Sequence, residues 1–241
     1  GQKMVNGKDQ RPLVSLVMNF TKPTDTKPSL LTFNEVTTFL HEFGHALHGM
    51  FSKCTYGSTS MDGVSRDFVE LPSQFMENFA LEKEWLDTWA VHYQTGEKIP
   101  QEYIDKIKKS SNFQAGYASD RQLSFGMVDM AWHTITEPVT EPLVNFEQRA
   151  MGKTEIMPLV KGSAFSPAFG HIFAGGYAAG YYGYKWAEVL DADAFSLFKQ
   201  KGLPYFRQGY RRIVPPQRAG KGRIRKPDDT LQALPRPRAD R

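Results

Sequence analysis

Two histidines and a glutamate, His41, Glu42 and His45, stand inside the apolar stretch LLTFNEVTTFLHEFGHALHGMF at residues 30–51. Removing a polar group from water without a partner costs roughly a few kcal/mol, so these side chains need partners. His41 and His45 are four residues apart, so on a helix they project from one face, about one turn apart. Two ring nitrogens at this spacing can hold one divalent ion at about 2.0–2.1 Å. The spacing therefore predicts a metal site.

Glu42 is the residue of this motif that could perform acid–base chemistry. On a helix it points roughly 100° away from His41, so it can reach a water molecule activated by the metal without ligating the metal itself. HEFGH is thus an H-E-x-x-H motif with Glu42 as the general base. The alternative is a pair of satisfied core histidines beside a salt-bridged glutamate. That interpretation leaves their shared spacing unexplained.

A third metal ligand has to come from elsewhere in the chain. His48 lies one turn further along the same helix, too far along the axis to complete a tetrahedral site. The metzincin pattern requires glycine at position 48 and histidine at position 51, and the chain has His48 and Phe51. The remaining class of H-E-x-x-H enzymes takes a glutamate from a following helix.

The following segment, RDFVELPSQFMENFALEKE, offers four such glutamates: Glu70, Glu77, Glu82 and Glu84. Glu82 and Glu84 are typical of a solvent-exposed surface. Glu70 and Glu77 are seven residues apart and share a helix face. Spacing alone leaves these two candidates open.

The elements that must position these residues are mainly helical. Thr32 and Glu35 form a predicted capping box at the start of the metal helix, which runs through Leu47. We predict a short buried strand at residues 13–20 and a loop at 54–66. We predict further helices at residues 71–93, 101–110, 119–135, 140–151 and 185–200, with a glycine- and tyrosine-rich loop at 162–184. The fold class is therefore mainly α with a small β element.

Composition limits the function classes. The chain has 241 residues and one cysteine, Cys54, which excludes an intramolecular disulfide and fits a reducing compartment. No apolar run approaches the roughly 18 residues of a membrane span, and no signal-peptide pattern is present. Residues 207–241 carry 11 basic against 3 acidic residues, so the net charge of +4 comes from this tail. We expect a cytoplasmic protein that binds no membrane.

Three motifs together resemble one enzyme family. HEFGHALHGMF, DFVELPSQFMENFA and FGHIFAGGYAAGYYGYKWAEVLDADAF occur in the order found in the thimet-oligopeptidase-like zinc metallopeptidases, which include oligopeptidase A and the peptidyl-dipeptidases. The resemblance covers roughly residues 10–202. It implies a zincin-type catalytic domain with one Zn²⁺ per chain, held by His41, His45 and Glu70. Glu77 then becomes a supporting residue.

The same resemblance gives the glycine- and tyrosine-rich loop a role at the substrate. It implies that His171, Tyr177 and Tyr184 contact the substrate and stabilise the oxyanion, with Tyr181 a weaker substrate-binding candidate. A phenol is a neutral donor that can point at a developing oxyanion, and glycines let a loop move toward bound peptide. The alternative is an aromatic packing cluster, which we favour for Tyr181 and Tyr182 taken alone.

We therefore expect a monomeric zinc metallopeptidase that hydrolyses short peptides, as a peptidyl-dipeptidase or an oligopeptidase, with the peptidyl-dipeptidase branch favoured. Family members are longer, so the chain is expected to be a fragment of a larger helical channel peptidase. An inactive zinc-binding fragment is one alternative. A nucleic-acid-binding protein is the other, and it depends only on the basic tail, because the rest of the chain shows no nucleic-acid motif.

Two regions are expected along the chain. Residues 1–202 form part of the catalytic domain, and residues 203–241 form a disordered tail rich in arginine and proline. This tail departs from the family at about Leu203. A neighbouring reading frame of residues 227–236 can encode PMTLYKRFRG, a closing pattern typical of the family. Our hypothesis is that the tail is a frameshifted translation.

Overall fold

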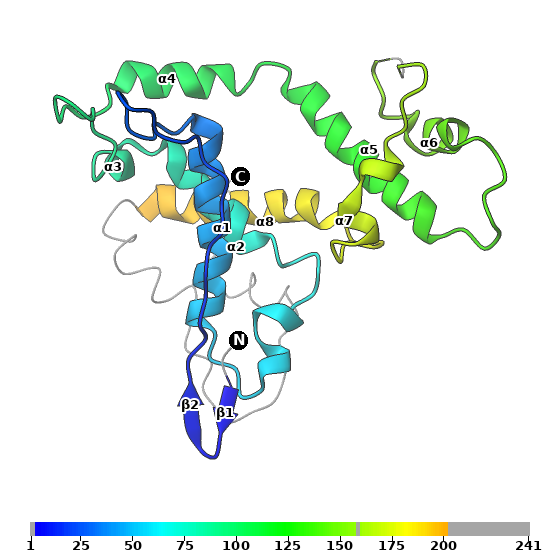
Figure 1. Cartoon of the computed structure of the whole chain (residues 1–241), viewed down its shortest axis with the longest axis horizontal. Coiled ribbons are helices and arrows are strands. Elements are labelled where there is room, and N and C mark those ends of the chain that lie inside the picture. The colour runs from blue at the N-terminus through cyan, green and yellow to red at the C-terminus, as the bar shows by residue number, and fades with distance from the viewer. Residues whose placement is uncertain (1–2, 158–159, 202–241) are drawn as a thin grey trace, which may run out of the picture. The chain divides into compact units, whose positions relative to one another are not determined.

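A computed structural model of the chain describes residues 3–157 and 160–201 (Figure 1). The fold is mainly helical, as predicted, with one small two-stranded sheet among the described residues. Two compact units can be distinguished. The first comprises residues 1–99 and those from Ala187 onward, and the second comprises residues 100–186.

The small β element differs from the predicted one. Strands β1 (Lys3–Val5) and β2 (Lys8–Gln10) form an antiparallel hairpin in which Met4 pairs with Asp9. The predicted buried strand at 13–20 is wrong: this segment has no regular structure, and the side chains of Leu13 and Val17 are almost fully exposed. A strand needs a neighbour to complete its hydrogen-bond ladder, and among the described residues none lies beside 13–20. The apolar composition of residues 13–20 was therefore not enough to predict a strand.

The segment after the hairpin instead runs along helix α1 (Phe33–Phe51), from the last turn of the helix to the first (Figure 1). At one end, the side chain of Arg11 donates to the carbonyl oxygen of Ser52 over 2.9 Å. At the other end, the backbone N–H of Thr21 donates to a carboxylate oxygen of Glu35 over 2.6 Å. The extended segment from Arg11 to Thr21 thus flanks helix α1 along its length.

The predicted start of α1 is confirmed. The hydroxyl of Thr32 accepts from the backbone N–H of Glu35 over 3.2 Å, and the Glu35 carboxylate accepts from the N–H of Thr32 over 2.7 Å. This reciprocal pair satisfies two of the backbone donors that a helix start leaves without intrahelical partners. The hydrogen bond from the Thr32 N–H, together with those from the hydroxyl and N–H of Thr21, holds the pKa of the Glu35 carboxyl down at about 2. The helix that carries HEFGH is therefore fixed at its first residue.

The predicted helix at 71–93 is wrong as a single element. The segment instead forms α2 (Leu71–Glu77), a 3₁₀ helix (Asn78–Leu81) and α3 (Lys83–Leu86). Glu82 has φ −90° and ψ 113°, which is extended backbone and ends the helical path. Phe79 beside this break is buried against Phe195 and Phe198 of α8 (Gly183–Lys201). Tertiary packing of aromatic side chains has outweighed the helical pattern here.

The second unit contains α4 (Gln101–Ser110), α5 (Ala115–His133), α6 (Leu143–Met151) and the short α7 (Gly170–Phe173). The predicted helix at 101–110 is confirmed, while α5 starts four residues earlier than predicted and α6 starts three residues later. The core of this unit is a cluster of buried apolar side chains, namely Val128, Met151, Phe169, Ile172 and Tyr181. The glycine- and tyrosine-rich segment therefore contributes to a packed core rather than forming a free loop.

Two further expectations concern the basic tail and membrane-spanning helices. The tail at 203–241, with the frameshift hypothesis attached to it, lies outside the described residues. Among the residues that are described, no helix has the length and apolar composition needed to cross a membrane.

Candidate active site

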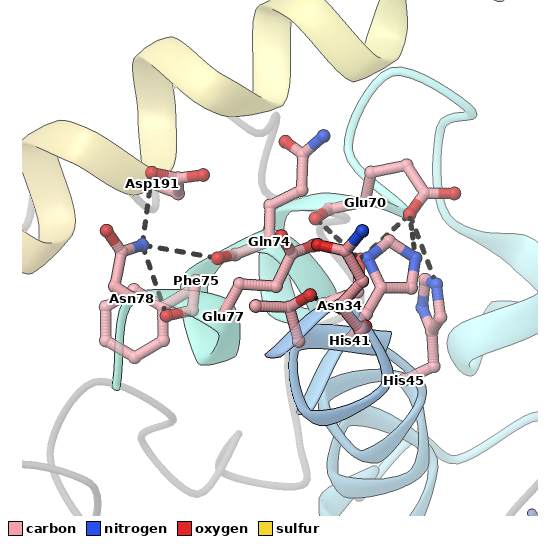
Figure 2. A network of polar contacts seen from close by, with 11 residues as sticks. Asn34, His41, His45, Glu70, Gln74, Phe75, Glu77, Asn78 and Asp191 are labelled. Atoms are coloured by element: carbon pink, nitrogen blue, oxygen red, sulfur yellow. Dashed lines mark hydrogen bonds and ion pairs between the residues drawn. The ribbon is translucent and has the colours of Figure 1, made fainter. Parts of the chain in front are cut away.

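Three of the predicted site residues come together in the first unit. The Nε2 atoms of His41 and His45 each lie 3.2 Å from the same carboxylate oxygen, Oε2 of Glu70 (Figure 2). The potential ligand atoms all lie within 4.8 Å of one another, and this is the one such His, Cys, Asp and Glu group in the described part of the chain. The two histidines come from successive turns of α1, and Glu70 is the residue just before α2. The fold thus brings Glu70 next to His41 and His45, although Glu70 lies at least 25 positions further along the chain.

The donor set and its spacing fit a zinc ion. Zinc in proteins is bound by imidazole nitrogens and carboxylate oxygens at about 2.0–2.2 Å, in tetrahedral geometry, so neighbouring ligand atoms are about 3.4 Å apart. The separations of 3.2 Å from Glu70 to each histidine are close to that value. Glu70 is only 1% exposed. A buried carboxylate facing two imidazoles is satisfied when a cation lies between them.

The position of Glu70 depends on how closely α2 approaches α1. Gly44, inside the HEFGH motif, packs against the backbone of Pro72 and Ser73, and a Cβ atom at Gly44 would lie 2.3 Å from the Pro72 carbonyl oxygen. Only a glycine leaves room for this contact. The buried hydroxyl of Ser73 donates to Oε2 of Glu70 over 2.8 Å, which fixes the carboxylate. The motif therefore supplies close packing as well as ligands.

The ionisation of His41 is shifted by its surroundings. Burial would lower the pKa of His41, but hydrogen bonds to Glu70 and Glu77 outweigh it and raise the pKa to about 9. In the metal-free protein the ring is therefore protonated at neutral pH. A metal ligand must be deprotonated, so metal binding at His41 releases a proton.

The other residues weighed for the site fall in different places. Glu42 lies on α1 with a half-buried side chain. His48 is not in the metal cluster; its ring packs edge-on against Phe68 at 6.4 Å between centroids, and burial lowers its pKa. Glu77 contacts His41 from the side away from Glu70, and its Oε1 lies 2.7 Å from Nδ1 of that ring. Both glutamates left open by the spacing thus contact one histidine.

The predicted substrate residues gather in the second unit. The ring of His171 lies 5.9 Å from that of Tyr177 and 6.4 Å from that of Tyr184, and the two tyrosine rings stack at 5.1 Å. Tyr181 is buried at 8% exposure and lies 5.0 Å from Tyr184, so it is a core residue. His171 is exposed, whereas Tyr177 and Tyr184 are half-buried. The rings of His171, Tyr177 and Tyr184 thus lie close together, and their contacts with substrate stay a prediction.

Two buried carboxylates that hold this segment were missed by the sequence analysis. Asp129 of α5 accepts from the backbone N–H groups of Ala179 and Tyr181, each over 2.9 Å, and contacts Nδ1 of His133 at 2.8 Å. Ala179 has φ 52°, in the left-handed region, so the hydrogen bond offsets a strained turn. The signal that could have found Asp129 is a lone carboxylate in the apolar run FGMVDMAW.

Glu147 of α6 plays the same part for the beginning of the segment. Its carboxylate oxygens accept from the backbone N–H groups of Phe165 and Ser166, over 2.9 and 2.6 Å. The side chain is only 1% exposed. Buried acids that accept backbone N–H groups are strong anchors for irregular chain. Asp129 and Glu147 thus fix the path of the aromatic segment from two helices.

Comparison with known protein families gives one decisive match. The model of "Peptidase family M3" matches residues 2–213, which is most of the chain. The chain belongs to peptidase family M3. The HEFGH helix, Glu70 and the aromatic segment all lie within the matched range.

Members of this family from plants and bacteria are similar to the chain. The chain is 48% identical over 194 residues to the organellar oligopeptidase A of Arabidopsis thaliana. The aligned region covers 80% of this chain and 24% of that protein. The chain is 44% identical over 207 residues to oligopeptidase A of Escherichia coli, and the aligned region covers 83% of this chain and 30% of that protein. The chain is 40% identical over 196 residues to the dipeptidyl carboxypeptidase of Salmonella typhimurium, and the aligned region covers 80% of this chain and 29% of that protein. The chain thus spans between about a quarter and a third of these family M3 relatives.

Proposed function

We propose that the chain carries the catalytic zinc site of an oligopeptidase, with His41, His45 and Glu70 as the metal ligands. The observation that supports this most directly is the convergence of two Nε2 atoms on one buried carboxylate oxygen at 3.2 Å. Membership of peptidase family M3 supports the reaction class. The proposed reaction is hydrolysis of a peptide bond.

The residues divide the work of hydrolysis between them. A zinc ion bound by the three ligands would supply Lewis-acid chemistry, polarising the scissile carbonyl and making water more acidic. Glu42 accepts the proton of the attacking water and later delivers it to the leaving amine. A carboxylate beside, and not among, the ligands remains free to exchange protons. The position of Glu42 next to His41 on α1 is compatible with the general-base role.

The aromatic segment supplies groups for the substrate. Tyr184 donates a hydrogen bond to the oxyanion that develops on the carbonyl oxygen, and His171 and Tyr177 position the peptide backbone. Their rings lie within 6.4 Å of one another, centre to centre, so they act on one part of the substrate. Tyr181 is buried and packs against the rings of Tyr177 and Tyr184. Gly176, with φ 81°, occurs in the turn before these tyrosines and permits its backbone conformation.

Short peptides are the proposed substrates. The sequence motifs favoured the peptidyl-dipeptidase branch, whereas sequence identity favours an oligopeptidase. Identity is 48% and 44% to two proteins named oligopeptidase A, against 40% to one named dipeptidyl carboxypeptidase. A monomeric state and a cytoplasmic location remain predictions. Residues 1–202 remain the proposed catalytic domain, and the family match covers residues 2–213.

The test is a quenched fluorescent peptide assay on the purified chain, with zinc measured in the same samples. Glu42→Gln is expected to retain one zinc per chain and to lose nearly all turnover. The matched control is Glu84→Gln, because Glu84 is an exposed glutamate of the same unit. It should leave both zinc content and turnover unchanged, and a chelator should abolish cleavage by the wild type.

Two outcomes would contradict the proposal. Cleavage by Glu42→Gln above about a tenth of the wild-type rate would remove Glu42 from the general-base role. Zinc binding without any chelator-sensitive cleavage would leave the chain as an inactive zinc-binding fragment. The nucleic-acid alternative depends on residues 203–241 alone, and no observation on the described residues favours it.

A further inference from the structure

The imidazole of His41 is held at both of its nitrogens. Nε2 lies 3.2 Å from Glu70, toward the metal cluster, and Nδ1 lies 2.7 Å from Oε1 of Glu77, on the opposite edge of the ring (Figure 2). The two glutamates flank α2, one before its first residue and one at its last. A ring held in this way cannot rotate or flip without losing both contacts.

The backbone that carries Glu77 is itself anchored. The side-chain amide of Asn78, the next residue, donates to the carbonyl oxygens of Gln74 and Phe75 over 3.2 and 3.3 Å, and to Asp191 of α8 over 3.4 Å (Figure 2). The rings of Phe75 on α2 and Phe198 on α8 pack at 5.1 Å between centroids. The end of α2 is therefore fixed to α8 by polar and aromatic contacts.

A fixed acceptor at Nδ1 determines which nitrogen of His41 is available to a metal. When Nδ1–H donates to Glu77, the lone pair of the neutral ring lies on Nε2, which faces Glu70 and His45. A carboxylate that accepts from the far nitrogen of a ligating histidine also makes that histidine a more basic ligand. Glu77 is 38% exposed in its side chain, so water also reaches this carboxylate.

We propose that Glu77 is a positioning residue for the metal site, holding the His41 ring in the tautomer and orientation that present Nε2 to the ion. The proposal rests on the proposed function of the His41, His45 and Glu70 cluster. Glu77 itself is no ligand in this assignment. Its effect on the ion passes through the ring of His41.

A purely structural role for Glu77 makes a different prediction. A contact that only ties α2 to α1 would contribute to the stability of the metal-free protein. Its loss would lower that stability and leave zinc affinity unchanged in the folded fraction. A positioning role instead lowers zinc affinity in protein that remains folded.

The experiment measures zinc affinity by competition with a chromogenic chelator for the wild type, Glu77→Ala, Glu77→Gln and the exposed control Glu84→Gln. We expect Glu77→Ala to weaken zinc binding by roughly 10- to 100-fold, the usual effect of removing such a partner. Glu77→Gln keeps an acceptor oxygen without the charge and should fall between Glu77→Ala and the wild type. Circular dichroism of each metal-free variant establishes that it is folded.

A second readout follows the ring itself. Nitrogen-15 spectra of the histidine rings in the zinc-loaded wild type should show a protonated Nδ1 on His41 that is protected from exchange, and Glu77→Ala should lose that protection. Unchanged zinc affinity and unchanged protection in folded Glu77→Ala would overturn the proposal while the metal site stands. A wild-type chain that binds no zinc would overturn the metal site and this proposal together.

Discussion

Gly44 and Pro72 are in contact so close that a Cβ atom on Gly44 would lie 2.3 Å from the backbone oxygen of Pro72. Gly44 lies between His41 and His45 of α1, and Pro72 lies two residues after Glu70. The distance between α1 and α2 therefore sets the distance from Glu70 to both imidazoles.

Gly44→Ala should push α2 away from α1 and separate the ligands. Because the clashing partner is backbone, the side chain cannot move aside, and overpacking of this kind costs about 1–3 kcal/mol. We expect a loss of that size in the free energy of unfolding, measured by urea denaturation. Zinc affinity should also fall, because Oε2 of Glu70 moves away from the two Nε2 atoms.

Gly116→Ala is the matched control for this substitution. Gly116 lies in the first turns of α5, where a Cβ atom would meet no other atom within 4 Å. Alanine is favoured over glycine in helices, so this variant should gain about 0.5–1 kcal/mol and bind zinc like the wild type. Equal stability and zinc affinity of Gly44→Ala and the wild type would show that the helix spacing is not what places Glu70.

The parts of the structure that the sequence predicted well are governed by local physics. The start of α1 follows from Thr32 and Glu35, three residues apart, and the pairing of His41 with His45 follows from the period of the helix. The spacing also reduced the third ligand to Glu70 or Glu77. The structure shows why it could go no further: both glutamates contact the same histidine.

The parts that the sequence predicted wrongly depend on contacts between distant residues. An apolar run such as residues 13–20 becomes a strand only beside another strand, and here it follows α1 instead. The helix predicted at 71–93 ends early because Phe79 packs against Phe195, more than a hundred residues away. Asp129 was missed for the same reason, since its partners lie about 50 residues further along the chain.

Asp129→Ala should destabilise the second unit and disorder the aromatic segment. The carboxylate is fully buried and accepts two backbone N–H groups, so its removal leaves buried donors without a partner. The cost of one such group is about 1–3 kcal/mol, and we expect a total of about 3 kcal/mol. Urea denaturation measures the loss, and near-ultraviolet circular dichroism reports the packing of Tyr177, Tyr181 and Tyr184.

Asp120→Ala provides the comparison for this variant. Asp120 is nine residues earlier on α5, which places it on the opposite face of the helix. It should change the free energy of unfolding by less than about 0.5 kcal/mol and leave the tyrosine signal intact. If Asp129→Ala behaved in the same way, the buried carboxylate would not be the anchor of the segment.

Asp191 makes the stability of the first unit depend on pH. Burial raises its pKa from 3.8 to about 6; the hydrogen bond from Asn78 opposes this rise, and the nearby charge of Glu77 adds to it. Between about pH 4 and pH 6 the folded state holds this proton more tightly than the unfolded state does. The free energy of unfolding therefore falls as pH rises through this window and stays lower above it.

Asp191→Asn removes this contribution, because an amide is neutral at every pH. The variant and the wild type should be equally stable near pH 4, and at pH 7 the variant should be more stable by about 1 kcal/mol, after allowing for partial solvation of the carboxylate. Urea denaturation of the metal-free chain at four pH values between 4 and 7 measures the difference. Asp193→Asn, at an exposed position of the same helix, should show none. Parallel curves for Asp191→Asn and the wild type would mean that Asp191 ionises normally and that its burial against α2 carries no electrostatic cost.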